Sequence, residues 1–174
     1  ATYSEHLLSQ FEDQHIILSS KIDNNNEDRS IRCWDLGKDD LNQLFNCVLE
    51  NKISSVLIQF NYGFFDFRSF SNFLKRTHDN NIKTLVILHS TIDPINDTSK
   101  KLKYISEQLA LCNRLLVHSP SDLNRLKNIG LIDNVTLFPH GVLDLDTYVR
   151  RNDHIKYINQ KLHFSTFGFC LPNK

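Results

Sequence analysis

The sequence predicts an α/β domain in which a mainly parallel, doubly wound sheet carries helices on both faces. Short apolar segments alternate at least four times with segments of helical period along the 174 residues. The apolar segments are continuous rather than alternating, which is typical of parallel strands covered on both faces. The length suits one domain that is large enough to bury its own core.

The first part of the chain predicts one helix followed by two short strands. Residues 2–5, "TYSE", have the T-x-x-E pattern of a capping box, which satisfies backbone donors at the start of a helix. The segments "HIILSS", from His15, and "IRCWDL", from Ile31, are predicted strands. The polar segment "KIDNNNEDRS" between them predicts a surface loop.

The helices that follow are marked by apolar period and by capping residues. Leu, Phe and Val recur with helical spacing over residues 41–49, and Asp66 is placed to cap a second helix. Ser119 and Pro120 predict the start of a later helix, which Gly130 ends. A further helix is predicted between the one capped by Asp66 and the one that starts at Ser119. It should place four residues in the core, namely Leu102, Ile105, Leu109 and Cys112. The parallel strands themselves are predicted over residues 56–60, 85–88, 115–117 and 135–138.

Composition narrows the classes of partner and compartment. The 20 basic and 20 acidic side chains cancel, so no basic field invites nucleic acid, and we expect none as a partner. No apolar run approaches the ~20 residues that span a bilayer, and no signal-peptide pattern opens the sequence. We therefore expect a cytoplasmic protein, for which a peripheral membrane contact stays open. The sequence predicts no particular oligomeric state.

The cysteines predict neither a disulfide framework nor a zinc site. Four cysteines are spread along the chain without a C-x-x-C pair, at Cys33, Cys47, Cys112 and Cys170. We expect reduced, mostly packed thiols in a reducing compartment, and no metal site.

Polar residues follow several of the predicted strands directly. Ligands of an open parallel sheet bind at the carboxyl ends of its strands, so these residues are the candidates for a ligand cleft. A lone histidine at a strand end is more often structural, but three on one edge favour a polar cleft. They define neither a catalytic triad nor a metal site. The candidates that line the cleft are Asn61, Tyr62, Gly63, His89, His118, Ser119, His140 and Gly141.

The glycines exclude several nucleotide-binding and hydrolase patterns. The five glycines form no G-x-G-x-x-G fingerprint and no G-K-S/T phosphate loop. The G-x-S-x-G nucleophile elbow is absent as well. A self-contained dinucleotide dehydrogenase, a P-loop NTPase and a simple serine hydrolase are thereby disfavoured.

An ordered set of segments resembles the group 1 glycosyltransferases of the GT-B fold. The segments are "VLIQFNYGFFDFRSFSNFLK", "TLVILHS", "NRLLVHSPSDLNRLKNIG", "NVTLFPHGV" and "TFGFCLPNK". They correspond, in order, to the family segments Q-H-E-[FY]-G-x-F, T-x-H, S-x-x-x-x-x-L, P-[HN]-G-V and G-F-x-x-P-x-K-G, which they resemble. In that family two Rossmann-like domains face each other across a cleft, and a sugar passes from a nucleotide donor to an acceptor with retention.

The resemblance implies a domain organisation and a set of partners. Residues 1–163 would be the N-terminal, acceptor-side Rossmann-like domain without its first strand, and residues 164–174 would begin the truncated donor-binding domain. The partners would be a nucleotide-sugar donor, as co-substrate rather than cofactor, and a glycan, lipid or small-molecule acceptor. Such a piece is expected to be inactive alone, because only a closed cleft aligns donor with acceptor.

Residue by residue, the resemblance implies three functional positions. His89 matches the family histidine that reaches the donor sugar and the departing phosphate, and is the candidate catalytic residue. Lys174 matches the lysine near the donor diphosphate, whose charge it would stabilise. Gly141, beside His140, matches a glycine that permits a tight turn at the cleft.

The chain also departs from the family pattern. Phe60 and Asn61 stand where the family often has His and Glu, and Phe169 lies where many members carry a diphosphate-binding arginine. Two alternatives therefore stay open. One is a nucleotide-sugar-modifying enzyme of another class, which would need an upstream glycine-rich loop and a Tyr-x-x-x-Lys pair. The other is a non-catalytic Rossmann-like binding module.

Overall fold

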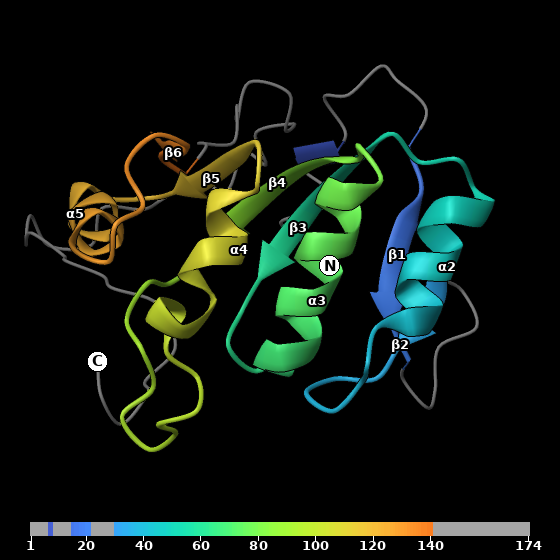
Figure 1. The fold of residues 1–174 in the computed structure, drawn as a ribbon, viewed down its shortest axis with the longest axis horizontal. Coiled ribbons are helices and arrows are strands. Elements are labelled where there is room, and N and C mark those ends of the chain that lie inside the picture. The colour runs from blue at the N-terminus through green and yellow to red at the C-terminus, as the bar shows by residue number, and fades with distance from the viewer. Residues whose placement is uncertain (1–6, 9–14, 22–29, 141–174) are drawn as a thin grey trace, which may run out of the picture. The chain divides into compact units, whose positions relative to one another are not determined.

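A computed structural model of the chain describes residues 7–8, 15–21 and 30–140 (Figure 1). The chain divides into residues 1–140 and 141–174, and every described residue belongs to the first unit. The predicted capping box at residues 2–5, the predicted boundary after residue 163, and the candidates Gly141 and Lys174 lie outside the described residues.

The six strands among the described residues form two parallel sheets. β1 (Ile17–Ser20) pairs with β2 (Ser30–Trp34) in a two-stranded sheet. The larger sheet has the order β3-β4-β5-β6, and every pairing in it is parallel. Its strands are Ser55–Phe60, Lys83–Leu88, Arg114–Val117 and Val135–Leu137. The predicted α/β class with a Rossmann-like parallel sheet is therefore confirmed.

The connecting helices begin close to their predicted positions. They are α2 (Asn42–Glu50), α3 (Phe67–Asp79), the 3₁₀ turn η1 (Leu102–Ile105) with α4 (Ser106–Ala110), and α5 (Pro120–Asn128). Asp66 caps α3 by accepting the Ser69 N–H at 2.9 Å, as the sequence predicted. The predicted third helix is instead a 3₁₀ turn followed by a short α-helix. Its four inward residues are all buried.

Leu41 lies outside α2, although its apolar spacing predicted that it would belong to the helix. It is the residue before the helix, it has a left-handed backbone with φ 60°, and it is 1% exposed. Such a φ is a strained conformation for a bulky side chain. The Asp39 carboxylate accepts the Leu41 N–H at 2.6 Å, and burial of the leucine side chain holds the turn in place.

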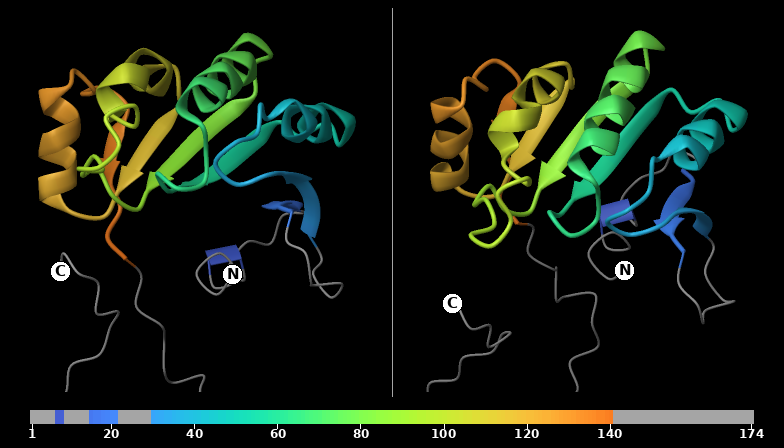
Figure 2. Two further views of the ribbon diagram at one scale, coloured as in Figure 1. Left: turned by 90° about the horizontal axis from the view of Figure 1, so that it is seen from below. Right: turned by 60° about the horizontal axis from the view of Figure 1, so that its bottom comes forward.

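The described helices α3, α4 and α5 pack on one face of the four-stranded sheet, as both views of Figure 2 show. Their shared core contains Val86 and Leu88 of β4 together with Val117 of β5 and Leu126 of α5. The reason is geometric: when strand order follows chain order, right-handed crossovers place every connecting helix on the same face. Helices on the second face, which the sequence predicted, are not among the described elements.

Three helices end in the same hydrogen-bonded motif, which starts the next segment at a fixed angle. After α5, Gly130 (φ 90°) donates its N–H to a helix carbonyl, and Leu131 donates to the carbonyl of Leu126 at 3.0 Å. This is a Schellman motif. Asn81 and Lys52 take the glycine's place after α3 and α2, with φ values of 57° and 52°. In the sequence, only Gly130 had indicated such a helix end, and Asn81 and Lys52 had not.

Candidate functional site

Three histidines meet at the carboxyl edge of the sheet. His89 directly follows β4, His118 follows β5, and His140 lies shortly after β6. The rings of His89 and His118 have centroids 5.3 Å apart, and those of His118 and His140 stack at 3.7 Å with 19° between their planes. Parallel strands bring their carboxyl ends to one edge, which is why residues so distant in sequence gather here.

His89 is exposed at the end of β4 and has a defined partner on the neighbouring strand. Its Nε2 lies 2.6 Å from Oε1 of Gln59, which belongs to β3. Partial burial lowers the pKa of His89 below its ordinary value, and repulsion from His118 and His140 lowers it further. The neutral imidazole is therefore favoured near neutral pH, a form that can donate and accept hydrogen bonds.

His118 ties the end of β5 to the segment after β6. Its Nδ1 lies 2.8 Å from the carbonyl oxygen of Phe138, which can only accept, so Nδ1 carries the proton. The Phe138 N–H in turn donates to the Val117 carbonyl at 2.7 Å. Burial and repulsion from His118 lower the pKa of His140.

The predicted candidates after β3 are engaged in local structure. Asn61 Oδ1 accepts the Gly63 N–H at 3.0 Å and shapes the turn. The Tyr62 hydroxyl donates to Asp93 Oδ1 at 3.0 Å, and its ring packs against Phe60 and Phe67. Burial, together with the bond to Asp93, raises the pKa of Tyr62 far above its ordinary value. Tyr62 is thus a protonated, half-buried donor within the scaffold.

Ser119 is the N-cap of α5. Its Oγ accepts the Asp122 N–H at 3.2 Å, and its hydroxyl donates to Asp122 Oδ2 at 2.5 Å. The sequence marked Ser119 as a residue that starts a helix, and the structure bears out that part of the prediction. The same hydroxyl was also a candidate to line a cleft, and it is engaged by the helix end.

Four polar residues hold this edge together, and sequence reasoning assigned none of them a side-chain partner here. Gln59, Thr91, Asp93 and Asp122 each bond a side chain about thirty positions away in the chain. Only Asp122 carried a local signal, because Ser119-Pro120-Ser121-Asp122 has the S-x-x-D spacing of a capping box.

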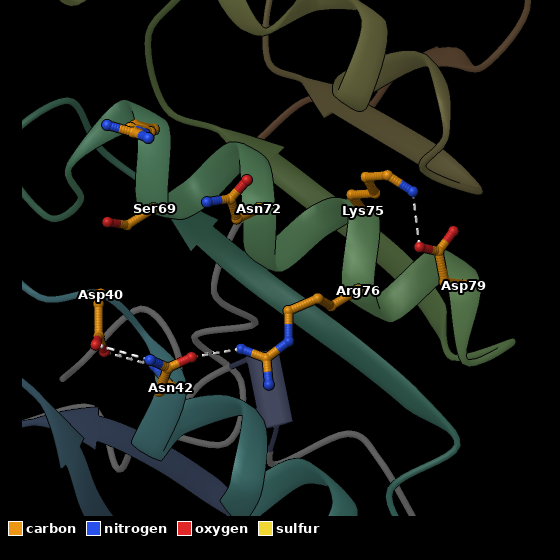
Figure 3. A pocket seen from close by; sticks show the side chains of 8 residues that line it. Asp40, Asn42, Ser69, Asn72, Lys75, Arg76 and Asp79 are labelled. Carbon is orange, nitrogen blue, oxygen red and sulfur yellow. Dashed lines mark hydrogen bonds and ion pairs between the residues drawn. The ribbon is translucent and has the colours of Figure 1, made fainter.

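None of the three histidines lines either of two open cavities formed by described residues. The larger, about 690 Å³, lies between the start of α2 and the outer face of α3 (Figure 3). Arg76 spans it, donating to Asn42 Oδ1 at 2.7 Å with its guanidinium 3.9 Å from the Phe45 ring centroid. Its lining is polar and open, whereas small-molecule sites are usually apolar with few polar groups. The lining residues are Asp40, Asn42, Arg68, Ser69, Asn72, Lys75, Arg76 and Asp79.

The smaller cavity, about 260 Å³, lies between the loop after β4 and α5. It combines an apolar floor that includes Leu102 and Leu126 with polar walls that include Thr91, Asp93 and Arg125. Its volume is below the range of typical ligand pockets. It borders the carboxyl edge on the helix side.

Comparison of the chain with protein-family models, with curated proteins and with solved structures found no match. Within the described residues, no helix is long and apolar enough to cross a membrane. The same part of the chain contains no group of three or more His, Cys, Asp or Glu side chains arranged to hold a metal ion. Function is therefore inferred from the residue pattern and from the geometry of the carboxyl edge.

Proposed function

We propose that the chain supplies the acceptor-side domain of a retaining GT-B glycosyltransferase, which moves a sugar from a nucleotide-sugar donor to an acceptor. The observation that carries the proposal is the position of His89. It stands where the sequence resemblance expects the family histidine, and its ring is exposed at the carboxyl end of a central parallel strand. That edge is where open parallel sheets bind their ligands.

The environment of His89 suits a hydrogen bond accepted from a hydroxyl of the donor sugar, because a neutral ring that donates its Nε2–H to Gln59 has an acceptor, not a donor, at Nδ1. With Nε2 donating to Gln59 Oε1, the ring has a fixed plane and tautomer. The lowered pKa keeps the imidazole neutral near pH 7. A contact to the donor sugar that strengthens as the sugar–phosphate bond breaks would lower the barrier directly.

The proposal assigns the remaining roles by resemblance. Lys174 would stabilise the charge of the departing diphosphate, and Gly141 would allow the turn that faces the cleft. Most donor contacts would come from the second domain, so the full-length protein is the catalyst. The acceptor would lie against the carboxyl edge described above.

A non-catalytic binding module with the same fold is the second candidate. It is favoured by the internal bonds of Asn61, Tyr62 and Ser119, whose polar groups are engaged by the scaffold. In such a module the histidine cluster would form part of a recognition surface, without bond cleavage.

The test is transfer, and donor hydrolysis, by the full-length protein with uridine- and guanosine-diphosphate sugars. His89→Ala should lower kcat by about 10²-fold, because loss of one transition-state contact costs roughly 3 kcal/mol. It should leave the melting temperature nearly unchanged. His78→Ala, an exposed histidine in the last turn of α3, is the matched control and should change neither quantity. Binding of a nucleotide sugar without turnover by the wild type would favour the binding module instead.

A further inference from the structure

A hydrogen-bond network centred on one carboxylate joins the loop after β4 to the start of α5. Asp122 Oδ1 accepts from Thr91 Oγ1 and from Arg125 Nη2, each at 2.6 Å. Its Oδ2 accepts from Ser119 Oγ, and Arg125 Nε donates to Thr91 Oγ1 at 2.7 Å. We call these four residues, Thr91, Ser119, Asp122 and Arg125, the Asp122 clasp.

The clasp is a partly buried, charged network. Thr91 is 5% exposed, and the Asp122 side chain is 13% exposed. Burial alone would raise the pKa of Asp122, but the hydrogen bonds from Ser119, Thr91 and Arg125 outweigh it and lower the pKa. The carboxylate therefore stays ionised, and hydrogen bonds to an ionised, shielded acceptor are stronger than neutral ones.

Helix capping accounts for only part of this network. Ser119 and Asp122 form the capped first turn of α5, and Arg125, in the last turn, is the i,i+3 ion-pair partner of Asp122. Thr91 belongs to a different loop, 31 positions away, and no helix end needs it. It stands two residues after His89, so its bond fixes the backbone that carries the histidine.

The same loop is anchored a second time, farther along. Asp93 Oδ1 accepts the Tyr62 hydroxyl and the Leu102 N–H, both at 3.0 Å. Lys100 Nζ donates to the Tyr62 carbonyl at 2.7 Å. These bonds tie the loop to the end of β3, so the anchor beside His89 is supplied by the Asp122 clasp.

We infer that Thr91 and Asp122 are positioning residues, which hold the loop after β4 so that the His89 ring keeps its place beside Gln59 and His118. The catalytic consequence rests on the proposed role of His89. The positional consequence stands without it, because it concerns only where the ring lies.

The experiment compares two buried threonines, Thr84 in β4 and Thr91 in the loop that follows β4. Thr91→Val removes the inter-loop hydroxyl and leaves the Ser119–Asp122–Arg125 bonds of α5 in place. Thr84→Val removes a hydroxyl that is 3% exposed and bonds Thr77 at 3.0 Å. Thr84 lies five residues before His89, about 16 Å along the strand. Both variants should lose a similar few degrees of melting temperature.

Histidine-selective NMR on the protein reads the position of the ring. The His89 and His118 ring centroids are 5.3 Å apart, and because the Overhauser effect falls steeply with proton separation, the contact between the rings should weaken by at least about half in Thr91→Val. The apparent pKa of His89 should rise toward the ordinary histidine value. Thr84→Val should change neither, and Thr91→Ser should restore both.

Equal effects of the two valine variants on His89, or no effect of Thr91→Val, would overturn the inference. If the protein proves active, Thr91→Val should lower kcat more than it changes KM. If the protein transfers no sugar while the NMR outcome holds, the proposed function fails and the positioning role stands. The two failures are thus distinguishable.

Discussion

The polar groups at the two ends of β4 have different kinds of hydrogen-bond partner. At the amino end, the Thr84 N–H donates to Asn113 Oδ1 at 2.8 Å, the Asn113 N–H donates back to the Thr84 carbonyl, and the two hydroxyls of Thr84 and Thr77 bond each other. At the carboxyl end, His89 bonds Gln59 of the neighbouring strand β3, and Thr91 bonds Asp122 of helix α5.

This difference distinguishes the amino end of β4, which is structural scaffold, from its carboxyl end, which is the candidate site. None of the groups that bond one another at the amino end titrates near neutral pH, so that end should be insensitive to pH. The carboxyl end gathers three imidazoles, where burial, and then repulsion between the rings, lowers the pKa of His89 and of His140. A fold tolerates such repulsion at a cost in stability, and perturbed titratable groups concentrate at functional sites.

The largest expected effect comes from removing the aromatic core beneath the carboxyl end. Phe60 is fully buried, and its ring packs against Tyr62, Phe67 and Phe70 at centroid distances of 5.3 to 5.9 Å. Phe60→Ala should lower the free energy of unfolding by about 3–5 kcal/mol, measured by urea titration. Phe64→Ala, at a ring that is 38% exposed, is the control and should cost far less. Equal losses of unfolding free energy in the two variants would mean that the buried Phe60 ring and the exposed Phe64 ring contribute equally to stability.

The scaffold could largely be predicted from sequence because its signals are local. Continuous apolar runs marked the strands, and Asp66 and Ser119 marked helix starts through side-chain bonds to backbone three positions later. The backbone at Leu41, Lys52 and Asn81 could not be predicted. A positive φ at those residues is imposed by packing and by neighbouring hydrogen bonds, which outweigh the intrinsic preference of the residue.

The candidate site could be predicted only in outline. The strand ends supplied the histidines, since parallel strands share an edge. The partners that fix them, Gln59 and the Asp122 clasp, lie in other segments of the chain, and pairing across such separations leaves no local pattern. The single-face arrangement of α3 to α5 likewise depends on strand order, which the sequence does not encode locally.

Acidification should affect the carboxyl end and leave the amino end intact. The pKa values of His89 and His140 are lowered in the folded protein, so the unfolded chain binds protons first. Stability is therefore constant above the unfolded histidine pKa of about 6.5 and decreases as the pH falls through it. The melting temperature should decrease from pH 7 to pH 5.

Amide hydrogen exchange, corrected for its intrinsic pH dependence, locates this change. The Phe138 amide, which bonds Val117 beside the His118–His140 stack, should lose protection in acid, whereas the Asn113 amide, which bonds Thr84, should keep it. Replacing His89 and His140 together by Gln should flatten the dependence. A uniform loss at both amides would show global destabilisation rather than a response of the histidine edge.

The smallest expected effect comes from an ion pair on the outer face of α3, which contrasts with the pair in the Asp122 clasp. Lys75 and Asp79 are 2.8 Å apart, but their side chains are 61% and 50% exposed, so water screens their attraction (Figure 3). A double-mutant cycle to Ala should give a coupling of only about 0.3–0.5 kcal/mol, which largely disappears in 0.5 M salt. The Asp122–Arg125 pair is of similar length, 2.6 Å, with the carboxylate shielded, so its coupling should be larger and should persist in salt. Equal couplings, with equal salt dependence, would show that shielding at the carboxyl edge adds nothing to a helical ion pair.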